Sequence, residues 1–289
     1  MAADLRALGR VLPRPAGERL GGDLRAVRVV WTRELIRFTH DRMRIVTSLI
    51  QPVLYLFVLG TGLSSLIGTD AKGSVSYRTF MFPGVLALSV MFTAIFSAAS
   101  IVWDREFGFL REMLVAPIGR ASIVVGKCLG GATVATLQGA VLIALAGFVG
   151  VPYSPILILE LVALLLILAF AMTAFGVMAA ARIRTMQSFM GLTQLILMPM
   201  FFLSGALYPL GSLPGWLNVL TRINPLTYAV DALRQTVFTH VDAGPLATRF
   251  SAGVTWFGWT VPVGLEVVIV IAMGLAMLLG AIAQFRRTE

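Results

Sequence analysis

The amino-acid sequence predicts an all-α integral membrane protein with six transmembrane helices. Hydrophobic residues make up 58% of the 289-residue chain and charged residues only 13%, and the mean hydropathy is +0.88. A soluble globular domain is usually about 45–50% apolar and about 25% charged. Apolar stretches of about twenty residues recur, which is the length a helix needs to cross the roughly 30 Å hydrocarbon core of a bilayer. We therefore expect these stretches to span a membrane.

The residues before the first span divide into two parts. Residues 1–22 are rich in Arg, Gly and Pro and lack the apolar core of a signal peptide, so we predict a mobile cytoplasmic N-terminus. Within 23–44, apolar residues recur at helical spacing: Leu24, Val27, Trp31, Leu35 and Phe38. Arg33, Arg37 and Arg44 fall on the opposite face. This pattern predicts an amphipathic helix along the membrane surface, with its arginines toward headgroups or a partner protein.

Six predicted spans form one transmembrane domain over residues 45–284, and residues 285–289 follow as a cytoplasmic tail. Their approximate bounds are 45–67, 80–103, 124–150, 156–181, 188–209 and 261–284. This layout places 18 of the 23 Lys and Arg residues on one side of the membrane and 5 on the other. Basic residues collect on the cytoplasmic side of membrane proteins. We therefore expect both termini to be cytoplasmic and the protein to lie in the plasma or inner membrane.

The segment between the fifth and sixth spans is too apolar for a solvated loop and too rich in Pro and Gly for a simple span. Irregular backbone at membrane depth persists only where protein or water satisfies it, so we predict short extracellular re-entrant helices over 205–240. Asn224 is a natural N-cap, and Pro225 suits the first position of a helix. We predict that an outer gate consists of this cap and the polar residues that follow it: Asn224, Pro225, Tyr228, Asp231 and Arg234.

A compact charged stretch, DREFGFLREMLVAP, occupies residues 104–117 between the second and third spans. Asp104 can cap a short helix, and acids are favourable at the positive N-terminus of a helix. A rigid helix tied closely to two spans suits a protein that receives a push from a cytoplasmic partner. The same residues equally fit a solvated loop, whose surface ion pairs contribute little.

We predict no catalytic residue, no cofactor site and no metal site in this chain. The lone Cys128 and two histidines make a poor set of metal ligands. GRASIVVGKC lacks the spacing of a phosphate-binding loop, since six residues separate Gly119 from Gly126 and Cys128 follows Lys127. We expect Lys127 to extend to lipid headgroups.

Polar residues inside the predicted spans are the only indication of a substrate path: Gln51, Gln138, Glu160, Gln194 and Glu266. Intramembrane carboxylates are costly and usually functional. However, Glu160 and Glu266 each lie about one turn from the outer end of a span, where they can reach the interface. Gln138 and Gln194 equally suit interhelical hydrogen bonds, worth about 0.6 kcal/mol each.

Three stretches resemble the membrane subunits of ABC-2 type exporters, particularly the daunorubicin-resistance and nodulation-export group: DREFGFLREMLVAPIGRASIVVGK, FLSGALYPLGSLPGWL and INPLTYAVDALR. With the six-span layout, the resemblance covers about residues 28–284. The first stretch resembles the loop in which the family's coupling helix meets the ATPase subunit, and the others resemble its extracellular re-entrant segment. The resemblance implies ATPase coupling through Arg105, Glu106, Phe107, Gly108, Leu110 and Glu112, assisted by Arg33 and Arg37.

The resemblance also implies partners and a function. Two copies of this chain would join two copies of a separate ATP-binding subunit, which uses ATP and Mg, and the permease itself would be non-catalytic. We expect export of a hydrophobic or amphipathic substrate such as a drug or lipid, in contact with membrane lipids and without nucleic acid. Export of a lipid-linked polysaccharide is the alternative within this class. A lipid-modifying membrane enzyme and a scaffold or sensor subunit are the alternatives of other classes.

Overall fold

The computed structural model describes residues 16–67, 77–108, 119–210, 214–241, 253–256 and 259–287. Within these ranges six helical segments are long and apolar enough to cross a membrane, which confirms the predicted all-α membrane class. The first 15 residues, and residues 109–118 with most of the predicted coupling helix, lie outside the described part of the chain.

The chain enters the bundle through a bent pair of helices. Asp41 separates helix α1 (Ala16–His40) from α2 (Arg42–Leu54), and the first span begins within α2. A π-helical segment, Tyr55–Leu59, joins α2 to α3 (Gly60–Ile67). Pro52 lies inside α2 just before this segment. A proline cannot donate to the carbonyl four residues earlier, so the regular helix is interrupted near this point.

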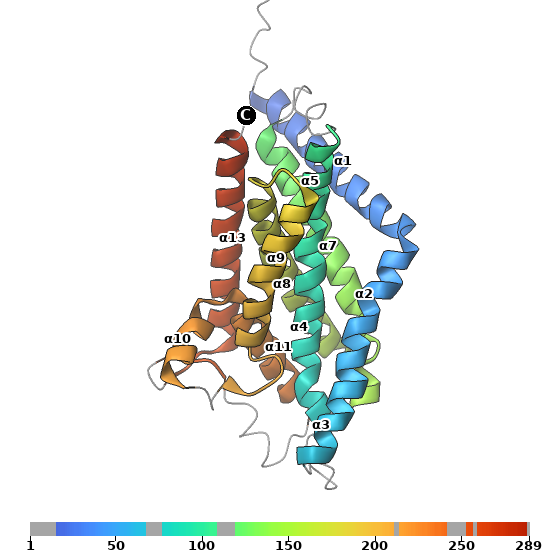
Figure 1. The fold of residues 1–289 in the computed structure, drawn as a ribbon, viewed down its shortest axis with the longest axis vertical. Helices are drawn as coiled ribbons and strands as arrows, with labels where there is room; N and C mark the ends of the chain where they lie inside the picture. The colour runs from blue at the N-terminus through green and yellow to red at the C-terminus, as the bar shows by residue number, and fades with distance from the viewer. Residues whose placement is uncertain are drawn as a thin grey trace, which may run out of the picture.

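Five further spans complete the bundle, and Figure 1 shows them aligned with the long axis of the molecule. They are formed by α4 (Tyr77–Ser97) with α5 (Ala99–Glu106), then by α7 (Arg120–Ile143), α8 (Pro155–Ala180), α9 (Met186–Leu203) and α13 (Val263–Arg287). A short 3₁₀ segment, Ala146–Val149, follows α7.

Helix α4 lies at the centre of the bundle, and nearly all of its side chains are buried. It packs against α7, α8 and α11. Gly84 permits one close approach, because a Cβ atom there would overlap the backbone of Ala206. Small residues at helix contacts of this kind allow membrane helices to come together without a hydrophobic driving force.

Two short helices, α10 (Gly215–Ile223) and α11 (Pro225–Thr239), lie between α9 and α13 in the sequence. Figure 1 places them at the end of the molecule opposite α1 and α5. The Asn224 Oδ1 atom caps α11 by accepting from the Leu226 N–H at 3.1 Å, and Pro225 takes the first helical position. A two-residue antiparallel pair, β1 (Thr255–Trp256) and β2 (Trp259–Thr260), precedes α13.

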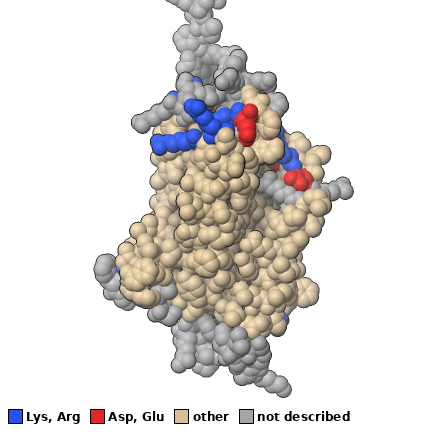
Figure 2. All heavy atoms as spheres, viewed as in Figure 1, with Lys and Arg blue, Asp and Glu red and all other residues tan. Residues whose placement is uncertain are grey.

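Charged side chains gather at one end of the described surface. In Figure 2 they lie over the end that carries α1 and α5, above a broad band almost without Lys, Arg, Asp or Glu. Such a band matches the hydrocarbon layer of a bilayer, where ionised side chains are rare. The orientation of the two termini across the membrane stays a prediction.

Candidate functional site

Helix α1 packs on α7 through glycines. Ala26, Val30 and Glu34 are its buried residues. A Cβ atom on Gly126 would lie 2.8 Å from the Val30 Cβ, and one on Gly130 would lie 2.7 Å from the Glu34 Cβ. The two glycines therefore leave a groove in α7 that admits α1. The residues that face α7 are not those of the predicted apolar stripe, of which Leu24 is 71% exposed. That the stripe faces the membrane stays a prediction.

A group that we call the ion cluster, buried except for Arg33, joins α1, α5 and α7: Arg33, Glu34, Ser100, Asp104 and Lys127. The Lys127 Nζ donates to Glu34 Oε1 at 2.7 Å, to Ser100 Oγ at 2.8 Å and to Asp104 Oδ2 at 2.9 Å. An ammonium group has three donors, so all of them are used. Arg33 Nη2 also donates to Asp104 Oδ2, at 2.7 Å.

The position of Lys127 corrects the expectation that it extends to headgroups, because the residue is only 4% exposed. Sequence reasoning also missed Glu34, Ser100 and Asp104 as its partners. One signal was available: Glu34 follows Ala26 and Val30 at four-residue spacing, so an acid lies on a face that is otherwise apolar.

Two of the predicted coupling residues hold the turn between α8 and α9. The Arg105 guanidinium donates to the carbonyl oxygens of Ala180 at 3.1 Å and Ala181 at 2.9 Å, and to that of Ile183. The Glu106 carboxylate accepts from the Met186 N–H at 3.1 Å, at the start of α9. A cation thus meets the negative end of α8 and an anion the positive end of α9. Both side chains therefore link α5 to this helix pair.

Other predicted coupling residues face outward. Phe107 is 64% exposed and packs only partly on the Trp103 ring, 5.4 Å away between centroids. Gly108, just after the end of α5, has φ of 84°, a left-handed value that glycine adopts readily. Arg37 is exposed on α1. Leu110 and Glu112 lie outside the described residues.

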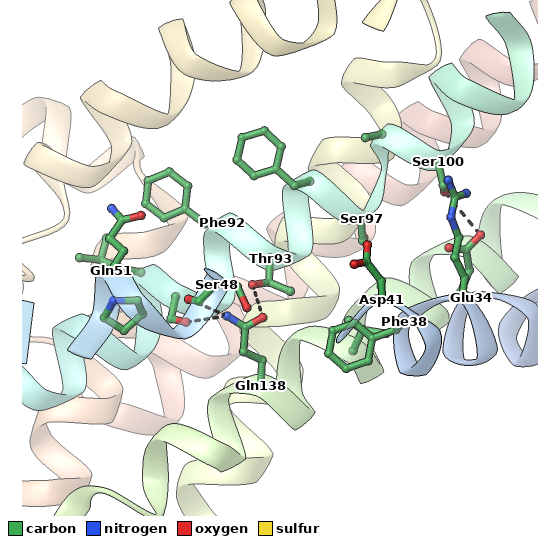
Figure 3. A pocket seen from close by; sticks show the side chains of 18 of the residues that line it. Glu34, Phe38, Asp41, Ser48, Gln51, Phe92, Thr93, Ser97, Ser100 and Gln138 are labelled. Carbon is green, nitrogen blue, oxygen red and sulfur yellow. Dashed lines mark hydrogen bonds between the residues drawn. The ribbon is translucent and has the colours of Figure 1, made fainter. Parts of the chain in front are cut away.

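A cavity of about 610 Å³ opens beside the ion cluster, between α1 and α2 on one side and α4 and α7 on the other. Gln138 provides its polar floor: the amide donates to Ser89 Oγ at 3.2 Å and accepts from Thr93 Oγ1 at 2.7 Å. It also donates to the Ser48 carbonyl at 3.3 Å, as Figure 3 shows. Pro52 cannot bond this carbonyl, so Gln138 satisfies the acceptor that the proline leaves open.

The cavity has aromatic walls and one charged end. Its aromatic lining residues are Phe38, Tyr55, Phe92, Phe96 and Trp103. Glu34, Arg37 and Asp41 line the end near α1. An apolar enclosure with a few polar groups at fixed places is typical of sites for small organic molecules.

The structure brings together only part of the predicted substrate path. Gln51 and Gln138 line the cavity. Gln194 is exposed on α9 and Glu160 is exposed on α8, both outside the cavity lining. Glu266 is fully buried at the start of α13.

The predicted gate residues of α11 are buried and fasten this helix to its surroundings. Arg234 Nη2 donates to the Gly205 carbonyl at 2.7 Å, and its guanidinium lies 4.2 Å from the centre of the Phe80 ring. Burial lowers the pKa of Arg234 to about 10, which leaves it charged at neutral pH. Asp231 Oδ2 accepts from the Val254 N–H at 2.7 Å, and Tyr228 Oη donates to the Arg222 carbonyl at 2.8 Å.

Nowhere in the described part of the chain do three His, Cys, Asp or Glu side chains come together to hold a metal ion. Glu34, which lines the cavity, and Asp104 are both engaged by Lys127, which suits a structural role better than acid–base chemistry.

Comparison with known proteins assigns the family. The model of the ABC-2 type transporter family matches residues 25–238. Nodulation protein J of Rhizobium meliloti is 32% identical over 209 residues, which cover 71% of this chain and 78% of that protein. The inner membrane transport permease YadH of Escherichia coli is 29% identical over 231 residues, covering 78% and 87%. The chain therefore belongs to the ABC-2 type transporter family and is a transport permease subunit.

Proposed function

We propose that this permease is the membrane half of an ATP-driven exporter, working as a pair with two copies of a separate ATP-binding subunit that uses ATP and Mg. The observation that carries the proposal is the linkage around α5. Asp104 ties α5 to α7 and α1 through Lys127 and Arg33, while Arg105 ties it to α8. A force applied at the exposed Phe107 would therefore reach three helices at once.

The cavity supports an amphipathic substrate. Its aromatic and apolar walls would hold a hydrophobic body, and the Gln138 floor and the charged end near Arg37 would hold polar groups. The walls come from α1, α2, α4, α5, α7 and α9, and α1, α5 and α7 are the helices of the ion cluster. Movement of α5 would thus change the shape of the cavity.

Gln194 supports the pairing of two copies. It lies within the fifth span, is exposed, and has no hydrogen-bond partner among the described residues. An exposed amide is unfavourable in hydrocarbon because its polar groups cannot be satisfied there. Contact of this α9 face with a second permease would provide the missing partners.

The test is co-expression of the tagged chain with ATP-binding subunits encoded beside it, followed by an ATPase assay of the eluted complex in lipid. We expect an active complex with equal numbers of the two subunits. Phe107→Ala should reduce ATPase recovery, while Phe148→Ala, which removes a 70% exposed ring from a different part of the chain, should not. Absence of any ATPase would favour the scaffold or enzyme alternatives, and wild-type behaviour of Phe107→Ala would contradict the coupling role.

Export of a lipid-linked polysaccharide is the second candidate, and the aromatic walls of the cavity favour it. Aromatic rings such as Phe92 and Phe96, which stack at 6.4 Å, offer flat apolar faces to sugar rings. Stimulation of the ATPase by a lipid-linked glycan, but not by an amphipathic drug, would select this candidate.

A further inference from the structure

Helix α10 carries its apolar side chains on the outside. Trp216, Val219, Leu220 and Ile223 are all exposed, Trp216 by 68% and Ile223 by 66%. They recur at three- and four-residue spacing, so they form one stripe along the helix. An amphipathic helix of a globular protein turns such a stripe toward the core, whereas α10 turns it away from the protein.

The polar side of α10 is bonded to the protein instead. Arg222 Nη2 donates to the Thr255 carbonyl at 2.9 Å, and the Arg222 carbonyl accepts from Tyr228 Oη at 2.8 Å. Thr221, which also lies away from the stripe, is 1% exposed. Because the bonds of Arg222 fix the rotation of α10 about its axis, the apolar stripe stays on the outside while they hold.

The C-terminal end of α10 lies at the depth of a transmembrane helix. Asn224, which follows α10, donates from Nδ2 to the Met200 carbonyl at 2.8 Å, and Thr227 Oγ1 donates to the Leu203 carbonyl at 3.1 Å. Met200 and Leu203 belong to the last turn of the fifth span, which is formed by α9. The apolar stripe therefore reaches the edge of the hydrocarbon layer that this span crosses.

Lipid fits this stripe better than a second copy of the chain does. Figure 1 shows α10 projecting from the side of the bundle, near the end opposite α1. Four side chains are few beside the roughly 20–30 residues that each partner contributes to a stable protein interface. None of the four is charged, and tryptophans such as Trp216 are enriched where membranes meet water. Helices with this pattern lie in the plane of a membrane interface.

We propose that α10 is a lipid anchor: its apolar stripe inserts among the acyl chains of the leaflet at this end of the bundle and holds the start of α11 at a fixed depth. Asn224 carries the connection, because it ends α10, caps α11 through Oδ1 and bonds to α9 through Nδ2. Tyr228 adds a second connection from α11 to the end of α10. The anchor does not depend on the identity of the substrate or of the ATPase.

Spin labels on single cysteines test whether the stripe lies in lipid. Cys128 is fully buried, so nitroxides attached to Val219→Cys and Ile223→Cys report on α10 alone. In vesicles of phosphatidylcholine and phosphatidylglycerol, we expect both labels to collide more with oxygen, which dissolves in lipid, than with a water-soluble nickel chelate. Leu275→Cys, midway along α13, is the lipid control, and Pro152→Cys, between α7 and α8, is the water control; both residues are exposed.

Three results would overturn the anchor. Preference of either α10 label for the nickel chelate would show that the stripe faces water. Spin–spin broadening that disappears when labelled protein is diluted with unlabelled protein would show that the stripe meets a second copy. Low collision with both reagents would show that protein covers the stripe.

Hydrogen–deuterium exchange in the same vesicles tests whether the anchor holds α11. Ile223→Asn places an amide in the stripe, where hydrocarbon cannot satisfy its polar groups. We expect the backbone amides of residues 229–233 in α11 to exchange at least about tenfold faster. Val268→Asn, which adds the same amide at an exposed position of α13, should leave these rates unchanged. Unchanged exchange in Ile223→Asn, or equal acceleration in both variants, would contradict the connection from α10 to α11.

Discussion

Three short hydrogen bonds compensate the buried positive charge of Lys127. Its neighbours Glu34, Ser100 and Asp104 come from two different helices, and each supplies one oxygen. Buried ion pairs give little net stability, because desolvation offsets their attraction, but the loss of one member leaves an uncompensated charge. The ion cluster therefore determines how α1, α5 and α7 are oriented more than how stable they are.

Replacement of Lys127 by Met tests this role. We expect the free energy of unfolding to fall by about 3–5 kcal/mol, because Glu34 and Asp104 lose their shared cation. Unfolding by denaturant in lipid micelles measures the change. The double variant Glu34→Gln/Lys127→Met should recover part of the loss. Equal stability of Lys127→Met and the wild type would contradict a buried ion cluster.

At the residue scale, local chemistry was predictable and long-range pairing was not. Asn224 and Pro225 start a helix because of the hydrogen-bond acceptor of one and the fixed φ of the other. Lys127 and Glu34 are 93 residues apart in the sequence. One sequence by itself does not show which faces of two distant helices pack against each other.

At the scale of helices, α5 contacts the turn between α8 and α9, as the ion cluster connects α5 to α1 and α7. Arg105 satisfies carbonyl groups that the end of α8 leaves without helical partners. Sequence reasoning assigned Arg105 and Glu106 to coupling by resemblance. Their inward contacts could not be predicted, since they depend on where α8 ends relative to α5.

Arg105→Met should loosen the turn between α8 and α9. Hydrogen bonds from a charged donor contribute about 1.5–3 kcal/mol each, so we expect backbone amides of residues 181–186 to exchange about ten- to a hundredfold faster. Hydrogen–deuterium exchange with mass spectrometry measures the rates. Arg184→Met, which removes an exposed arginine of the same turn, is the matched control. Unchanged exchange in Arg105→Met would show that these bonds do not hold the turn.

A separate prediction concerns ligand binding in the cavity between helices α2 and α4. Gln51→Trp places a large ring at an exposed position of the lining, so a fluorescent amphipathic dye should bind at least about tenfold more weakly, a loss of about 1.4 kcal/mol. Leu159→Trp adds the same ring on α8 at a residue that is 72% exposed and outside the cavity. Fluorescence titration in nanodiscs compares the two. Equal affinity would place the dye elsewhere.

Across the whole molecule, composition was a sufficient guide to the number of spans, because the bilayer imposes one length and one polarity on every crossing segment. It was insufficient for the cavity, whose walls come from helices that meet only after the bundle packs. The same limit applies to Glu266, which the sequence placed near an interface and the structure places in the interior.

The predicted orientation can be tested with single cysteines. Cys128 is fully buried, so it should not react and need not be removed. We expect an impermeant maleimide to label Pro152→Cys in intact cells and Gly21→Cys only after the membrane is opened, since both sites are exposed at opposite ends of the bundle. The reverse pattern would invert the topology.

The distance along the chain between Glu34 and Lys127 has a consequence for biosynthesis. Helix α1 leaves the ribosome before any transmembrane segment, but its counterion follows 93 residues later. At about 5–20 residues per second, translation takes roughly 5–20 s to supply it. During that interval the face of α1 that carries Glu34 has no groove to bind, so we expect α1 to dock only after the third span, α7, has been synthesised and inserted.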